Sequence, residues 1–151
     1  VGNAQELLKE KNTSVDDKVL AYMVTARAEQ DKGAFTEAIR NFRNVVSINK
    51  ASFAAEARYE IASCYYSLND LKNADKAAFE TINKSGSYDF WITRAYILLG
   101  DIYFKEKDYF NAKATLQSVV DNSRTTELKN EAAEKLRTVI DAEKAESKIA
   151  G

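Results

Sequence analysis

Residues 96–116, YILLGDIYFKEKDYFNAKATL, contain the most informative pattern for predicting the fold. Apolar and small residues recur at three- and four-residue spacing, as in Leu99, Gly100 and Tyr103, which places them on one face of a helix. Asp108 stands where its carboxylate can cap a following helix. The stretch therefore predicts two consecutive helices joined by a short turn.

The same pattern occurs twice more towards the N-terminus. Three segments align so that each has an alanine at one shared position: Ala38 in 34–42, Ala74 in 71–79 and Ala112 in 109–116. Twelve residues before each alanine stands another small residue: Ala26, Ala62 and Gly100. The intervals between successive alanines are 36 and 38 residues. Small residues are expected where the two antiparallel helices of a pair cross, because larger side chains would hold the backbones apart. The sequence thus predicts a repeated helix pair.

Helices are expected along the whole chain, because proline is absent and only five glycines occur. The apolar spacing predicts helices near 15–32, 35–48, 53–68, 71–84, 89–106, 109–122 and 126–146, and a shorter one near 3–11. The expected N-caps are Ser14, Ser52, Asp70, Ser87 and Asp108. Gly33 is expected to take the left-handed conformation that closes a helix.

The aligned units resemble the tetratricopeptide repeat over residues 19–126. The third unit matches the family pattern at Leu99-Gly100, Tyr103, Tyr109, Ala112 and Leu116, and the second at Ile61-Ala62, Tyr65, Leu71 and Ala74. The first unit shares Ala26, Gly33, Phe35, Ala38, Phe42 and Val45, but Thr25 and Glu29 replace the family's Leu and Tyr. No unit closes with the usual proline, and both periods exceed the usual length of about 34 residues.

The resemblance implies an all-α fold, a right-handed α-α superhelix (TPR-like solenoid) of about three helix pairs with flanking helices. We expect one domain over 1–151. Its expected parts are the remnant of a preceding helix at 1–14, repeats at 19–52, 55–88 and 93–126, and a capping helix at 126–146.

The composition excludes several classes of protein. Hydrophobic residues make up 45% of the 151, which is enough to bury a core and argues against disorder. The net charge of −1, without a basic tract, argues against binding to nucleic acid or an anionic membrane. No apolar stretch approaches the length of about 18 residues that a membrane helix needs, so we expect no membrane insertion by this segment. Because the chain begins at Val1, we expect it to be a processed or excised part of a longer protein.

The usual components of a catalytic or metal site are missing. The chain has no histidine, and its one cysteine, Cys64, lies in a helix expected to be buried on one side. An inert buried thiol is therefore expected rather than a nucleophile or redox centre. No glycine-rich phosphate loop, cysteine cluster or metal-ligand spacing occurs. We expect no enzyme activity, no metal and no cofactor.

The resemblance implies a concave surface, lined by the first helix of each pair, that binds a protein or peptide. Its exposed positions here are Met23, Arg27, Gln30, Tyr59, Ser63, Tyr66, Arg94, Ile97, Asp101 and Phe104. Tyrosine and arginine often anchor protein interfaces. The alternative is that Tyr66 and Phe104 pack between neighbouring units as core. A family clamp for a C-terminal carboxylate would fall on Met23, Arg27, Glu60, Arg94 and Leu98, and we expect none because only two of these are basic.

An aromatic cluster stands at the start of the fifth expected helix, at Tyr88, Phe90 and Trp91. An exposed contact patch is one interpretation of it. We favour the other, in which Phe90 and Trp91 fill the joint between the second and third units.

The long units, the tyrosine-rich first helices and the final Ala-Lys-x-x-Leu-x-x-Val run resemble tetratricopeptide proteins of bacterial cell envelopes, the relatives of outer-membrane assembly lipoproteins and Tol-Pal coordinators. This likeness favours the periplasm or cell envelope, and a cytoplasmic location stays open. The expected function is a non-catalytic scaffold for a protein or peptide partner. The alternatives are a homo-oligomerisation module and a regulatory domain of a larger protein.

Overall fold

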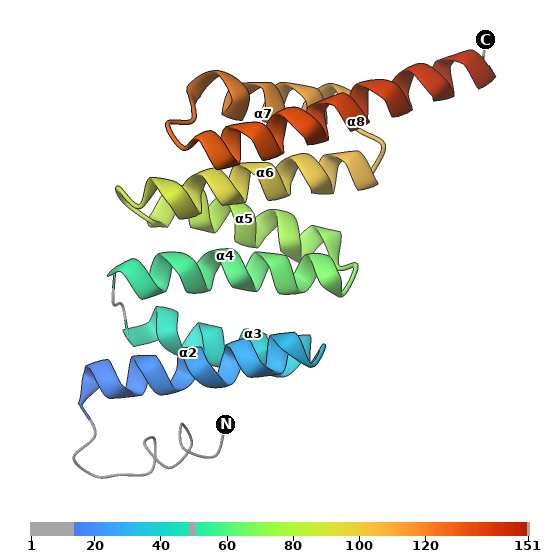
Figure 1. Ribbon diagram of the computed structural model, residues 1–151. Helices are drawn as coiled ribbons and strands as arrows, with labels where there is room; N and C mark the ends of the chain where they lie inside the picture. Colours follow the sequence, from blue (N-terminus) through green and yellow to red (C-terminus); the bar gives the residue numbers. More distant parts are fainter. Residues whose placement is uncertain (1–13, 49–50, 151) are drawn as a thin grey trace.

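The fold is a stack of helices, seen in a computed structural model that describes residues 14–48 and 51–150 (Figure 1). The described residues form α2 (Val15–Asp31), α3 (Phe35–Ile48), α4 (Ala51–Ser67), α5 (Leu71–Lys84), α6 (Asp89–Lys105), α7 (Tyr109–Asn122) and α8 (Thr126–Ala150). Each helix packs against the next along the chain, so that α2/α3, α4/α5 and α6/α7 are antiparallel pairs. The expected all-α solenoid is confirmed, while the expected helix at 3–11 lies outside the described residues.

Local capping explains most helix starts. Ser14 Oγ accepts a hydrogen bond from the Asp17 amide at 3.1 Å, and Asp70 and Asp108 each cap in the same way with the amide three residues on. Two expected caps are wrong. Ser52 lies inside α4, which begins one residue before it, and α6 follows an N-cap residue, Tyr88, that makes no side-chain cap bond. Ser87 therefore precedes the cap position.

The turns within the three pairs share one geometry. The backbone is left-handed at Gly33 (φ 80°), Asn69 (φ 59°) and Lys107 (φ 61°), and these residues recur at the same intervals as the repeat alanines. In each turn the amide of the next residue donates to a carbonyl five residues earlier, at 2.8 or 2.9 Å. This is the Schellman closure of a helix, confirmed at Gly33 and repeated by two residues that are not glycine.

The small residues lie where the helices of a pair cross. The five repeat alanines at these positions are all fully buried: Ala26, Ala38, Ala62, Ala74 and Ala112. A Cβ atom on Gly100 would come within 2.6 Å of Leu116 Cδ2 and 2.7 Å of Leu116 Cγ. The close approach of α6 to α7 therefore depends on the missing side chain at this position.

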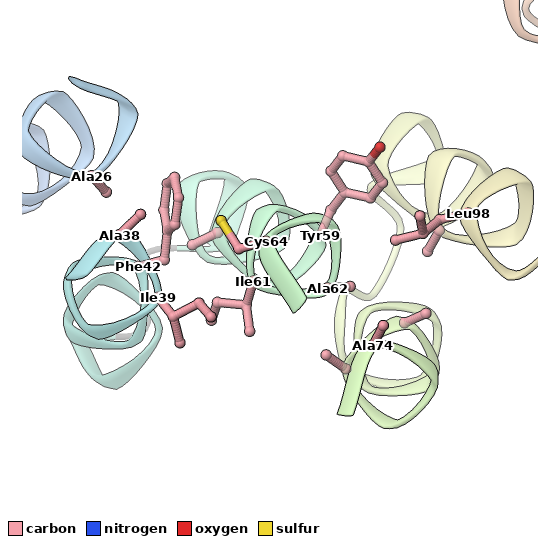
Figure 2. Close-up of a cluster of buried hydrophobic side chains, with 14 of the residues drawn as sticks. Ala26, Ala38, Ile39, Phe42, Tyr59, Ile61, Ala62, Cys64, Ala74 and Leu98 are labelled. Carbon is pink, nitrogen blue, oxygen red and sulfur yellow. The ribbon is translucent and has the colours of Figure 1, made fainter. Parts of the chain in front are cut away.

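The core continues through the stack in two parts. The larger part extends from α2 to α6, and Figure 2 shows Phe42 and Cys64 within it. The smaller part joins α6, α7 and α8 through the buried residues Ile97, Ala112, Leu116, Val119, Leu128, Ala132 and Val139. Cys64 is fully buried as expected, and its burial raises the pKa of the thiol to about 12, which favours the protonated, unreactive form.

The aromatic cluster before α6 divides between core and surface. Trp91 packs against the larger part of the core, with its ring centroid 5.7 Å from that of Tyr59. Phe90 meets the edge of Trp91 but remains 44% exposed, and Tyr88 is also exposed. The expected filling of the joint is confirmed for Trp91 and wrong for Phe90. Adjacent residues of a helix point about 100° apart, so the two rings cannot enter the same joint.

The last helix is longer than expected, since α8 ends at Ala150 rather than near residue 146. Leu128, Ala132 and Val139 bury its apolar stripe against the preceding pair. Its final turns are largely exposed and consist mostly of Ala, Glu and Lys, which are strong helix formers. Lys113 and Tyr109 on α7 donate hydrogen bonds to Glu143 and Glu146 in these turns.

Candidate functional site

One face of the stack is formed by the first helices of the pairs together with α8. Contacts join α2 to α4, α4 to α6 and α6 to α8, so these four helices lie side by side (Figure 1). We call their shared polar surface the first-helix face. Its residues are Arg27, Gln30, Glu56, Tyr59, Glu60, Tyr66, Arg94, Asp101, Lys105, Glu131 and Lys135.

Three of the residues expected to be exposed on this face are buried. Met23, Tyr59 and Ile97 have less than a tenth of their surface exposed and belong to the core. Each faces the packed side of its helix, so the expectation of exposure is wrong for them, although the hydroxyl of Tyr59 still reaches a hydrogen-bond partner on α6. The expected exposure was based on the position of each residue within its repeat. That position does not account for the rotation of one helix pair relative to the next.

The other seven expected residues retain exposed surface. Arg27 is exposed, and Gln30, Ser63, Tyr66, Arg94, Asp101 and Phe104 are half-buried. Tyr66 and Phe104 also pack against the core, as the alternative interpretation had it. The ring centroid of Phe104 lies 6.2 Å from that of Tyr109 on α7. The ammonium group of Lys105 lies over the ring of Tyr66.

Polar bonds join α2 to α4. Arg27 Nη2 lies 2.6 Å from Glu56 Oε2, and Gln30 Nε2 donates to Glu60 Oε1 at 3.2 Å. Burial raises the pKa of the Glu60 carboxyl, and the hydrogen bond from Gln30 opposes that shift. The carboxyl is therefore a partly desolvated acceptor at the middle of the face.

Arg94 joins three helices. Its Nη2 donates to the Tyr59 hydroxyl at 3.1 Å, and its guanidinium carbon lies 5.0 Å from the centroid of the Tyr59 ring. Its Nη1 lies 3.7 Å from Glu131 Oε1 on α8. The buried Nε of Arg94 has no hydrogen-bond partner among the described residues. This N–H group is therefore an unsatisfied buried donor.

A second bridge joins α6 to α8. Lys135 Nζ lies 2.9 and 2.8 Å from the two carboxylate oxygens of Asp101. Burial raises the pKa of Asp101, and the hydrogen bond from Lys135 opposes that shift. The ammonium group of Lys105 lies 4.9 Å from the centroid of the Tyr66 ring, which adds a cation–π contact between α6 and α4.

Comparison with known proteins identifies the repeated unit. Residues 55–78 and 93–126 match the family model for the tetratricopeptide repeat. These two segments are therefore tetratricopeptide repeats. The chain is similar to a solved structure titled "Crystal structure of MamA", with 18% sequence identity and a TM-score of 0.63 over 96% of this chain and 87% of that one. That likeness concerns the fold alone. No curated protein matches the chain.

Tetratricopeptide-repeat proteins act as scaffolds for protein partners and are generally not catalysts. Within residues 14–48 and 51–150, no group of three or more acidic or cysteine side chains could hold a metal ion. In the same ranges no helix is both long and apolar enough to cross a membrane. The first-helix face contains hydrogen bonds, ion pairs and cation–π contacts.

The residue spacing predicts only part of the first-helix face. Arg27, Arg94 and Asp101 were among the expected residues, but the charged residues that pair with them were not: Glu56, Glu131 and Lys135. The bonded pairs are between 29 and 37 residues apart, which is close to one repeat period. Opposite charges about one repeat period apart in the sequence would have indicated these partner residues.

Proposed function

We propose that this chain binds an extended polar segment of a protein partner on the first-helix face. The observation that carries the proposal is the continuous row of partly exposed polar groups across α2, α4, α6 and α8. Both charge signs and the partly exposed ring of Tyr66 are represented in it. Such a row offers donors and acceptors to a peptide backbone as well as charges to its side chains.

The pairs already present on the face set the chemistry of this binding. Arg27–Glu56 and Arg94–Glu131 include partly exposed groups, and ion pairs of this kind contribute only about 0–1 kcal/mol. A partner's carboxylate or amide can replace one side of such a pair at little cost. Tyr66 supplies the aromatic surface beside them.

The test begins with the double variant Arg27→Glu/Tyr66→Ala. Proteins captured by the wild type from a lysate of the source organism are purified, and their affinity for both forms is measured by calorimetry. We expect the captured partner to bind the double variant at least about tenfold more weakly than the wild type. This corresponds to a loss of about 1.4 kcal/mol in binding free energy. Tyr59 is left unchanged, because it is buried and its loss would disturb the fold.

The matched control is Lys72→Glu/Phe110→Ala. It makes one charge reversal and one aromatic truncation at exposed positions of the second helices. We expect this control to bind like the wild type, and circular dichroism must show both variants to be helical. Equal affinity of the partner for all three forms would contradict binding on this face.

The finer part of the proposal is that this recognition serves a bacterial cell-envelope assembly. It is supported by the long repeat units and tyrosine-rich first helices that resemble envelope proteins of the family.

Attachment to a larger protein as a regulatory domain is a further proposal for the same scaffold. Fractionation of the source cells, followed by detection of the full-length protein, tests both.

A second candidate function is self-association, and the outer side of α2 favours it. Leu20 and Val24 lie one turn apart and are 46% and 40% exposed. We expect Leu20→Glu/Val24→Glu to abolish a concentration-dependent rise in mass measured by light scattering. A wild type of constant monomeric mass over the whole concentration series would contradict self-association.

A further inference from the structure

A second groove lies on the other side of the stack, between α3, α4 and α5. It consists of two adjoining cavities of about 330 and 340 Å³, and Arg43 and Tyr65 line both. Figure 2 shows Ile39 and Ile61, which line these cavities, on the side of α4 away from Tyr59. The groove is therefore separate from the first-helix face, and each cavity is of the size of a small ligand pocket.

The groove combines an apolar floor with a basic rim. Apolar atoms come from Ile39, Val46, Ile61 and Ala77. The rim has four cationic side chains and one carboxylate: Arg40, Arg43, Arg58, Lys76 and Glu80. This local excess of positive charge stands out on a chain whose net charge is −1. An occupant must accordingly present an apolar group together with negative charge.

Two of the rim cations are held in place by hydrogen bonds that do not neutralise their charge. Arg43 donates a hydrogen bond to the Tyr65 hydroxyl, and its guanidinium carbon lies 5.8 Å from the centroid of the Tyr65 ring. Arg58 Nη1 donates to the Lys84 carbonyl oxygen at 2.9 Å. Over the described part of the chain, none of the four rim cations lies within ion-pair distance of a carboxylate. Guanidinium groups held in this way are prepared for bidentate contacts with carboxylates.

We propose that this groove binds an acidic peptide segment, which inserts an apolar side chain over Ile61 and places flanking carboxylates against Arg43, Arg58 and Lys76. The apolar floor distinguishes such a segment from a free anion, which would leave that surface uncovered. The two adjoining cavities give room for more than one side chain along α3 and α4. This site is independent of the proposed function, because it uses no residue of the first-helix face.

The experiment selects peptides from a displayed random library with the whole chain as bait. Three baits are compared: the wild type, Arg43→Glu/Lys76→Glu, and the control Arg124→Glu/Lys129→Glu. The control makes the same change of charge at exposed residues outside the groove. Circular dichroism establishes that all three are equally helical.

We expect the wild type and the control to enrich peptides in which two or more Asp or Glu residues flank an apolar residue. The Arg43→Glu/Lys76→Glu bait is expected to lose this class. The most enriched peptide, labelled with fluorescein, should bind this variant at least about tenfold more weakly by anisotropy. Changing its acidic residues to Asn and Gln should cause a similar loss.

Three outcomes would overturn the proposal. The first is that the wild type enriches no acidic class, and the second is that the Arg43→Glu/Lys76→Glu bait retains it. The third is full competition by inorganic phosphate together with equal binding of peptides that lack the apolar residue, which would show a simple anion site. None of these results bears on the first-helix face, which the Arg27→Glu/Tyr66→Ala variant tests separately.

Discussion

Replacement of Phe42 by alanine is expected to lower the free energy of unfolding by about 3–5 kcal/mol. The ring of Phe42 is fully buried in the larger part of the core, in the middle of α3 (Figure 2). Truncation removes its apolar surface from the core and leaves a cavity that the surrounding helices can fill only in part. A loss of this size is a large fraction of the stability of a small domain.

Urea unfolding followed by circular dichroism measures this effect, and Trp91 fluorescence reports in parallel on the joint between the later helix pairs. Comparing the two probes is necessary because repeat proteins can unfold in parts. The matched control is Phe110→Ala, since Phe110 is also on a second helix but is 77% exposed. We expect the control to change stability by less than about 0.5 kcal/mol. Similar small effects of both variants would contradict the assigned core.

Gly100→Ala is expected to destabilise the protein by about 1–3 kcal/mol, against the usual preference of helices for alanine. The added Cβ would lie 2.6 Å from Leu116 Cδ2, so α6 and α7 must move apart or Leu116 must change rotamer. Neither adjustment is free in a tightly packed crossing. Thermal and urea unfolding measure the loss. A gain in stability would show that the crossing is looser than described.

A double-mutant cycle with Leu116→Ala tests the cause. Leu116→Ala alone is expected to cost about 2–5 kcal/mol, because Leu116 is fully buried. In the double variant the new methyl group of residue 100 occupies space that Leu116 vacated. We therefore expect the double variant to be more stable than the sum of the single changes predicts, by at least about 1 kcal/mol. Additive losses would show that the destabilisation arises elsewhere.

Local patterns were sufficient to place the helices. Asp70 and Asp108 were assigned as caps from the residues around them, because capping involves only a side chain and an amide three residues away. The turns at Asn69 and Lys107 were not anticipated, since neither residue type requires the left-handed conformation. The geometry common to all three turns comes from the Schellman bonds, which the packing of each pair maintains.

The candidate site shows where local patterns stop being informative. Residue spacing selected Arg27, Arg94 and Asp101, which all take part in bonds across the first-helix face. It also selected Met23 and Ile97, which are buried. Which side of a first helix is covered depends on how the next pair packs against it, and this is a property of residues about one repeat away in the sequence.

The all-α class, the helix pairs and the small residues at their crossings can be predicted from the sequence, because each of these follows from spacings within a few turns of helix. Which polar groups contact one another depends on the packing of the helices. Arg94 reaches Tyr59 and Glu131 only because α4, α6 and α8 stack side by side, and Arg43, Arg58 and Lys76 surround one groove only because α3, α4 and α5 pack together. The distances between these side chains cannot be read from residue spacing, because they depend on the rotation and separation of successive helix pairs.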